Sequence, residues 1–168
     1  MQKRRSVREF DPERDVPLES INRLLEAAIL APTAGDRQPW HFVIVRKPSV
    51  KEAIARTALR QDFIATAPVV IVVCGEPERS GARRGQEMAE LHTVQDVSAA
   101  VENILLATTD LGLASCWVSA LREDEVRQAL DLPPAFRPLA IVPIGFAARR
   151  PGARPPRRPV DAVTTFID

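Results

Sequence analysis

Apolar residues along the chain fall into alternating stretches of two kinds, one with helical spacing and one continuous. In residues 18–31 they recur every three or four positions, which predicts a helix with one buried stripe and with Pro17 at its start. Similar patterns predict three further helices: residues 50–58, capped by Ser49; residues 90–111, ended by Gly112; and residues 123–130.

Short apolar runs rich in β-branched residues predict the strands, at residues 42–45, 69–73, 113–119 and 139–146. Pro143 cannot donate to a ladder, so the last of these strands is expected at an edge or a bulge. Residues 76–86 contain Gly, Pro and Arg and are interpreted as a surface loop. Strands that alternate with helices predict an α/β fold with a mixed central sheet flanked by helices.

The chain ends in a segment that cannot stabilise itself. Residues 149–159 are rich in Pro and Arg and are expected to be extended, and residues 163–167 are predicted as a strand. Because a lone strand after a linker has nothing to pair with, it must dock on something else. We therefore expect a single domain over residues 1–168, in which residues 148–168 form an extended arm.

The connection between the first helix and the first strand, residues 31–42, has the composition of a tight turn. Pro32 ends the helix, Gly35 and Asp36 permit the turn, and the small side chains of Thr33 and Ala34 leave the main chain approachable. Two interpretations fit this pattern: an ordinary helix-to-strand connection, or a binding loop held by rigid elements on both sides.

Composition narrows the class of protein. The 168 residues are 45% hydrophobic and 27% charged, which is enough to bury a core. No stretch approaches the roughly 18 apolar residues of a membrane span, and no apolar segment follows the first positive charges, so we expect a cytoplasmic protein without a membrane partner. Cys74 and Cys116 have no CxxC spacing and are expected to be small buried apolar residues.

The net charge of +1 hides an uneven distribution. Nine of the 23 basic residues lie in two acid-free segments, residues 3–8 and 149–158, which leaves 14 basic against 22 acidic residues, a net charge of −8, over the rest of the chain. A protein that binds nucleic acid over a broad face is expected to be basic along that face. Two short cationic segments fit a compact anion, such as one phosphate group, better.

The motifs of several reaction classes are missing. There is no GxSxG turn for acyl transfer, and neither GxGxxG nor GxxxxGK[ST] for a nicotinamide or nucleoside triphosphate site. His41 is typical of a core residue, and His92 has no partner at metal-ligand spacing, so no metal is expected. A bound phosphate would need arginine forks, which Arg4, Arg5 and Arg8 offer together with the Ser6 hydroxyl; the alternative is a solvated basic tail.

In order and spacing, the sequence resembles the FMN-dependent nitroreductase family over nearly its whole length. The resemblance rests on segments that follow one another along the chain: Arg4-Arg5-Ser6-Val7-Arg8, Ala31-Pro32-Thr33, Gln38-Pro39-Trp40-His41-Phe42, Ala67-Pro68, Gln95-Asp96, Leu111-Gly112-Leu113, Cys116-Trp117 and Arg157-Arg158-Pro159. It implies an α/β homodimer with FMN in two clefts at the subunit interface and with the C-terminal arm reaching over the partner.

The resemblance also implies the site, residue by residue. Arg4, Arg5, Ser6 and Arg8 would hold the phosphate and ribityl side of FMN, with Arg157 or Arg158 closing on the phosphate. Pro32, Thr33 and Ala34 would come from the other subunit to face the isoalloxazine ring. Ser119 and Ala120 look like main-chain donors near the flavin N5, and Gln61 is a looser match for the ring edge. No catalytic side chain is implied.

The implied activity is transfer of hydride from NADH or NADPH, through bound FMN, to a nitroaromatic, quinone or similar small-molecule acceptor by a ping-pong mechanism. Thr33 stands where serine is more usual and Asp36 where asparagine is more usual, and the chain lacks the helical insertion of larger members, so substrate choice is the open question.

Three alternatives remain. One is a non-reductase member of the same fold, which fragments flavin or removes halogen, and another is a flavin-binding protein without turnover. The third is a basic-armed RNA-binding module, which the acidic body and the 5% aromatic content disfavour.

Overall fold

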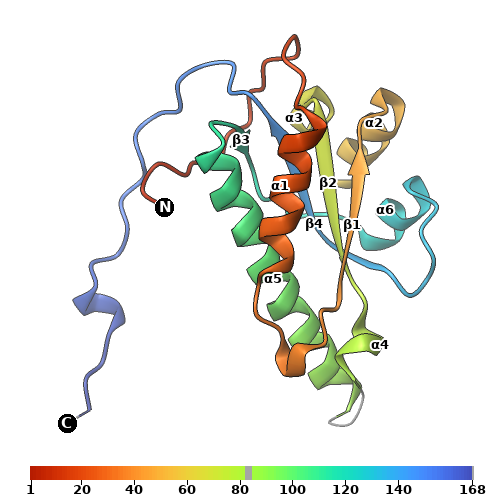
Figure 1. Ribbon diagram of the computed structural model, residues 1–168, viewed down its shortest axis with the longest axis vertical. Helices are drawn as coiled ribbons and strands as arrows, with labels where there is room; N and C mark the ends of the chain where they lie inside the picture. The colour runs from red at the N-terminus through yellow and green to blue at the C-terminus, as the bar shows by residue number, and fades with distance from the viewer. Residues whose placement is uncertain (82–84, 168) are drawn as a thin grey trace.

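The computed structural model describes residues 1–81 and 85–167, and in this part of the chain a four-stranded sheet forms the centre (Figure 1). The strand order is β1-β2-β4-β3, and each neighbouring pair is antiparallel. The strands are β1 (Trp40–Val45), β2 (Val69–Gly75), β3 (Ala114–Ser115) and β4 (Arg137–Gly145). The predicted α/β class, with a central sheet flanked by helices, is confirmed. The sheet was expected to be mixed, but its four strands pair antiparallel, and parallel pairing in the described residues is confined to the isolated bridge between Ser6 and Ser115.

Helices cover both faces of this sheet (Figure 1). Those on one face are α1 (Leu18–Ile29) and α5 (Gln86–Asp110). Those on the other are α2 (Pro48–Thr57), α3 (Phe63–Thr66) and α6 (Glu123–Ala129), while the short α4 (Pro77–Ser80) joins β2 to α5. None of the helices in the described residues is long and apolar enough to cross a membrane.

Strand β2 shows why the core forms here. Its residues alternate between the two faces, so that Val69, Ile71 and Val73 pack toward α1 and α5. Val70, Val72 and Cys74 pack toward α2, α3 and α6. All six are 0% exposed, and each buried valine or isoleucine contributes roughly 1.5–3 kcal/mol. A strand covered on both faces is continuously apolar, as the sequence is.

Helix boundaries mostly follow the predicted ones. Helix α5 has 25 residues, and Gly112, with φ 71°, follows its end as predicted. Pro17 precedes α1 instead of beginning it, and Ser49 does not cap α2, because Pro48 already occupies the first turn and no side chain caps that end. The predicted loop at residues 76–86 contains α4, and residues 82–84 of it lie outside the described residues.

Strand predictions near the end of the chain need two corrections. The strand predicted at residues 113–119 is only two residues long, supplemented by a bridge from Val118 to Ile141. Pro143 lies on the interior strand β4 and not at the bulge, which falls between Val73 and Cys74. The N–H of Ile141 donates to the carbonyl of Val118, on the β3 side of β4. The backbone nitrogen of Pro143, two residues later, points to the same side of the strand. The pairing between β3 and β4 is interrupted there, so the missing N–H of Pro143 breaks no ladder bond.

The arm is extended, as predicted, but its end is not a strand. It leaves the body beside the N-terminal segment and runs away from it (Figure 1). In place of a strand at residues 163–167 there is one 3-10 turn, η3 (Asp161–Val163), followed by extended chain. Phe166 and Ile167 are 85% and 94% exposed. A strand needs a neighbour for its ladder, and no described residue of this chain supplies one.

Candidate functional site

A cavity of about 670 Å³ lies between the N-terminal segment and the arm. One wall is formed by residues 4–9 and the other by residues 149–155 with Arg157. Seven of the lining residues are arginines, and Glu9 is the one acid among them in the described chain. A volume of this size is typical of small-ligand pockets, and the lining favours an anion.

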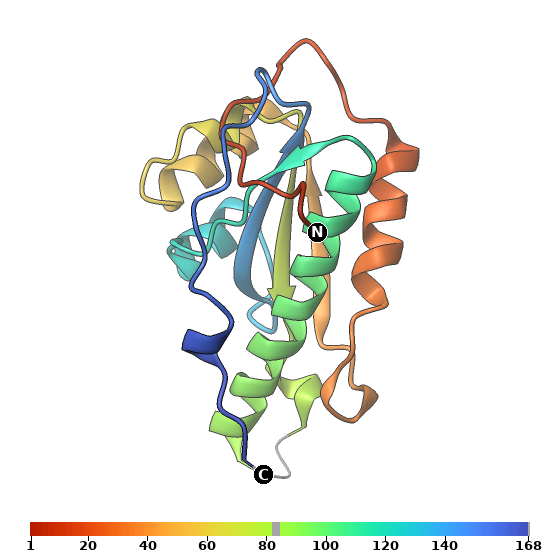
Figure 2. The ribbon, with the colours of Figure 1, turned by 90° about the vertical axis from the view of Figure 1, so that its left-hand side faces the viewer.

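The N-terminal wall is held by main-chain hydrogen bonds to the sheet. Ser6 pairs with Ser115 as a short parallel bridge, and the N–H of Val7 donates to the carbonyl of Ser115 at 2.9 Å. Beyond it, the N–H of Ala148 donates to the carbonyl of Glu9 at 3.0 Å. Figure 2 shows this segment crossing beside β3. The arginines at positions 4, 5 and 8 therefore project from a fixed backbone and not from a loose tail.

Arg5 provides the clearest ligand signal. Its Nη1 donates to the carbonyls of Gln2 and Arg4 at 2.8 and 2.9 Å, whereas its Nε is buried and has no hydrogen-bond partner among the described residues. A buried donor without an acceptor costs about 1–3 kcal/mol. An anionic oxygen in the cavity would remove that cost, so the residues present fit a phosphate group.

The other arginines of the N-terminal wall are lightly held. Arg4 Nε lies 3.8 Å from the Glu102 carboxylate, a weak and partly exposed ion pair. The Arg8 guanidinium lies 5.8 Å from the centre of the Phe63 ring. Both side chains can therefore turn toward a ligand at small cost.

Arg154 is a site residue that the sequence analysis missed. Its Nη2 donates to three main-chain carbonyls of the N-terminal segment: Met1 at 3.2 Å, Gln2 at 3.0 Å and Arg4 at 3.0 Å. It thereby joins the two walls of the cavity. Nothing in the spacing of residues 149–158 distinguishes Arg154 from the arginines around it. Its hydrogen bonds reach carbonyls at the other end of the chain, which local sequence cannot indicate.

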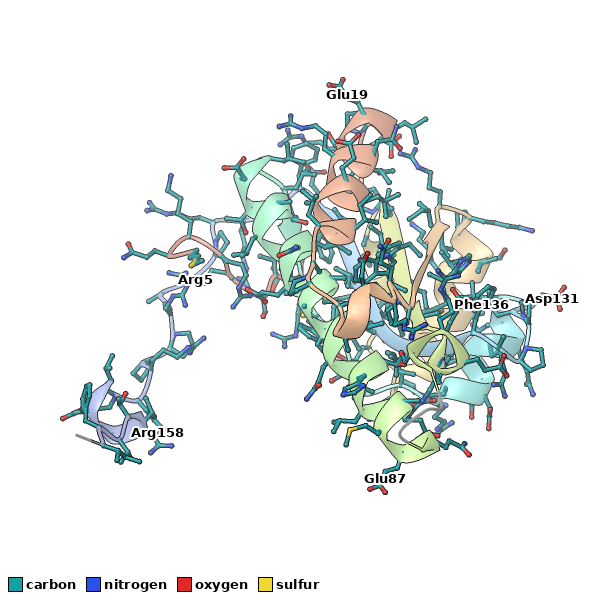
Figure 3. The ribbon with its side chains drawn as sticks, turned by 60° about the horizontal axis from the view of Figure 1, so that its bottom comes forward. Arg5, Glu19, Glu87, Asp131, Phe136 and Arg158 are labelled. Carbon is teal, nitrogen blue, oxygen red and sulfur yellow. The ribbon has the colours of Figure 1, made fainter. Side chains whose placement is uncertain are left out.

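Of the two arginines that the resemblance offers for closing on the phosphate, Arg157 lines the cavity and Arg158 does not. The Nη2 of Arg158 donates to the carbonyl of Ala162 at 2.6 Å, within the turn η3. Figure 3 shows Arg158 at the far end of the arm, well separated from Arg5. Of Arg157 and Arg158, therefore, Arg157 is the one that joins Arg149, Arg150 and Arg154 in lining the cavity of its own chain.

The residues predicted to face the flavin ring do not line this cavity. Pro32 and Thr33 lie between α1 and the 3-10 turn η1 (Ala34–Asp36), which Ala34 begins, and none of the three lines the cavity. Gln61 follows α2, and its Nε2 donates to the carbonyl of Ala58 at 3.0 Å. Within one chain, the residues predicted to bind the FMN phosphate therefore line a common cavity, with Arg158 as the exception, whereas the residues predicted to contact the flavin ring lie outside that cavity.

Ser119 and Ala120 are exposed and follow the bridge between Val118 and Ile141. Within the described residues, no main-chain acceptor pairs with the N–H of either residue. Their N–H groups are thus without a main-chain partner, and neither residue lines the cavity, so their predicted contact with the flavin stays a prediction.

The cysteines and His41 belong to the packed interior. Burial raises the pKa of the Cys74 thiol to about 12. Burial also raises the pKa of Cys116, against the opposing influence of Arg8, Ser6 and Arg4. Both cysteines are free, as predicted, and both stay protonated at neutral pH. The His41 ring stacks on Phe136 with the ring centres 4.1 Å apart, consistent with a packing role.

The fold and the cavity together describe an α/β protein with an arginine-lined cavity beside its sheet. Comparison with known proteins identifies the class further. The chain belongs to the nitroreductase family, whose model matches residues 1–61 and 49–146. This confirms the resemblance seen in the sequence.

Two archaeal relatives carry the name "Putative NADH dehydrogenase/NAD(P)H nitroreductase". The protein of Methanothermobacter thermautotrophicus is 35% identical over 155 residues, which cover 90% of this chain and 77% of its own length. The protein of Archaeoglobus fulgidus is 35% identical over 147 residues, which cover 85% of this chain and 80% of its own. Both names describe an oxidoreductase.

Solved structures share the fold. A protein of the same name from Parabacteroides distasonis superimposes with a TM-score of 0.82 at 30% identity, over 94% of this chain and 90% of its own. A nitroreductase from Exiguobacterium sibiricum, solved in complex with FMN, gives a TM-score of 0.89 at 18% identity, over 98% and 93% of the two chains. At that identity the second comparison establishes the fold alone.

Proposed function

We propose that this protein is a homodimeric FMN-dependent oxidoreductase. It takes hydride from NADH or NADPH and delivers it to a nitroaromatic, a quinone or a similar acceptor in a ping-pong cycle. The observation that carries the proposal is the arginine-lined cavity of about 670 Å³, in which Arg5 holds a buried Nε donor without a partner. The names of the two archaeal relatives and the FMN complex of the Exiguobacterium protein support it.

In this proposal, different residues of the cavity make different contacts with FMN. Arg4, Arg5 and Arg8 supply charge-assisted hydrogen bonds to the phosphate, Ser6 adds a hydroxyl, and Arg157 closes from the arm. When bound, FMN supplies the hydride-accepting and hydride-donating chemistry of its ring. The protein supplies position and charge, which is why no acid–base pair is needed at the cavity.

A second subunit completes the site in this proposal. Pro32, Thr33 and Ala34 lie outside the cavity of their own chain and would face the ring of the FMN held by the other. The exposed N–H groups of Ser119 and Ala120 would serve as donors near N5, and Gln61 would contact the ring edge.

The arm explains how two subunits would stay together. Its outer part carries exposed apolar residues that no described part of this chain covers: Val160, Val163, Phe166 and Ile167. Burying them on a second copy would remove apolar surface from water. We therefore propose that the arm is exchanged across the dimer, with FMN at the interface.

Absorbance spectroscopy tests the activity directly. The purified protein, incubated with FMN and freed of excess, is expected to keep a flavin spectrum that NADH or NADPH bleaches under anaerobic conditions and a nitroaromatic or quinone restores. Protein that stays colourless after incubation would overturn the proposal. A flavin that binds, but that neither nicotinamide reduces, would instead favour the non-reductase or non-turnover alternatives.

A further inference from the structure

Asp96 is a buried carboxylate on α5 that contacts a loop 62 residues away in sequence. Its side chain is 6% exposed, and Oδ1 and Oδ2 lie 3.1 and 3.2 Å from the main-chain nitrogen of Ala34. Burying a carboxylate costs free energy unless hydrogen bonds and nearby positive charge compensate. The contact with Ala34 therefore offsets part of the cost of burying this carboxylate.

The Ala34 N–H needs this acceptor. Ala34 begins the 3-10 turn η1, and the first N–H groups of a helix have no partner within it. The residue before it, Thr33, makes no cap with its side chain. Instead, the Thr33 hydroxyl accepts a hydrogen bond from the N–H of Gln38 at 3.3 Å. Asp96 therefore caps the turn from a different element, with the negative charge that a helix N-terminus favours.

The loop that Asp96 holds has a strained backbone. Gly35, Asp36 and Gln38 have φ angles of 64°, 55° and 51°. Left-handed backbone is unfavourable for residues other than glycine and persists when surrounding contacts enforce it. One such contact is local, between Gln38 Nε2 and Asp36 Oδ1 at 2.8 Å. The hydrogen bond from Ala34 to Asp96 connects the same loop to the core of the protein.

Charge around Asp96 is consistent with a capping role. Burial raises its pKa, whereas the Ala34 N–H and His92, one turn earlier on the same helix, act in the opposite direction. The interactions that favour the carboxylate form of Asp96 are therefore those with the Ala34 N–H and with His92.

We propose that Asp96 is a positioning residue for the cofactor site. Its carboxylate holds the loop of residues 33–38, which includes the left-handed Gly35, Asp36 and Gln38, and so sets the wall that Thr33 and Ala34 present to the FMN of the other subunit. This inference rests on the proposed function, because it assigns the wall to a flavin. Asp96 itself does not touch the cofactor in this proposal; it acts through the Ala34 N–H.

Three variants separate this role from general stabilisation. Asp96→Ala removes both acceptors, and Asp96→Asn keeps one carbonyl oxygen for the Ala34 N–H. The control is Thr108→Ala, since Thr108 is 0% exposed on the same helix and its Oγ1 donates only along that helix, to the Ile104 carbonyl at 2.7 Å. FMN affinity is measured by quenching of flavin fluorescence, and the protection of the Ala34 amide by hydrogen exchange without FMN.

We expect Asp96→Ala to lower FMN affinity by about tenfold or more, to change the visible spectrum of bound flavin, and to abolish protection of the Ala34 amide. Asp96→Asn should restore most of the affinity and protection, and Thr108→Ala should lose stability while binding FMN like the wild type.

Two results would overturn the inference while leaving the proposed function intact: unchanged FMN affinity in Asp96→Ala, or Asp96→Asn binding as weakly as Asp96→Ala. Wild-type protein that binds no FMN would instead overturn the proposed function itself.

Discussion

Seven arginines and no lysine are among the described residues that line the cavity. The planar guanidinium can donate two parallel hydrogen bonds to one phosphate, whereas an ammonium acts as a point charge. Arginine at these positions therefore favours an oriented anion over a diffuse cloud of counterions. This is the property that a cofactor held by its phosphate requires.

Arg8 allows a matched test at the scale of single residues. Arg8→Ala is expected to weaken FMN binding by about 1.5–3 kcal/mol, the usual range for a hydrogen bond to a charged group. Arg14→Ala is the control, because Arg14 also stacks on a phenylalanine, Phe146, but lies outside the cavity. Titration of both variants with FMN measures the difference. Equal affinities in the two variants would remove Arg8 from the site.

Short motifs led to residues that the structure brings together. Arg4, Arg5, Ser6, Arg8 and Arg157, which the family resemblance assigns to the phosphate side of FMN, line one cavity, and their contact with FMN stays a prediction. The sequence predicted no contact for Arg154, nor for Asp96 beyond its place in the Gln95-Asp96 segment, because both side chains contact main-chain groups that are distant in sequence. A side chain that binds main-chain atoms has no partner residue type that a sequence could reveal.

At the scale of elements, the arm is the segment whose exposed apolar residues suggest contact with a second subunit. Replacing Phe166 and Ile167 together by Glu should weaken the dimer and, with it, FMN binding, because charged side chains would replace the apolar contact we propose. Sedimentation velocity with and without FMN measures both effects. Leu18→Glu, at a residue 68% exposed at the start of α1, serves as the comparison. A double variant that remains dimeric and flavin-bound would contradict arm exchange.

Helices and strands were predicted correctly where apolar periodicity alone determines them, and incorrectly where a strand also depends on pairing with a neighbouring strand. Helices α1, α5 and α6 and strand β2 follow from apolar spacing, since one face or both faces are buried. The strands expected near residues 113–119 and 163–167 depend on pairing. In the described chain the first pairs with β4 over only two residues, and the second has no partner. Apolar, β-branched sequence is thus necessary for a strand but not sufficient.

Stability of the whole molecule should depend on pH through Cys74. Its folded pKa is about 12, above the value of about 8.5 for an unfolded chain, so the thiol stays protonated when folded and ionises on unfolding. Stability is therefore highest below pH 8.5 and falls as pH rises toward 12, by about 2 kcal/mol between pH 8 and pH 10 from this thiol. Urea unfolding of the wild type and of Cys74→Ala at both pH values measures the contribution.

Cys74→Ala is expected to be less stable at pH 8 because it leaves a cavity, but to lose about 2 kcal/mol less than the wild type on going to pH 10. Parallel losses in the two proteins would show that the thiol is ionised in the folded state as well.

The architecture of the cavity has a consequence for the kinetics of folding. Its two walls meet through the pair formed by Arg149 and Glu9, which are 140 residues apart in the chain. Contacts between residues so far apart in sequence form late in folding, because the chain must first lose the conformational entropy of the loop between them. A ligand held there would meet its site only after the sheet has assembled. A bound ligand would therefore slow unfolding while leaving the folding rate almost unchanged, because its contacts are absent from the transition state.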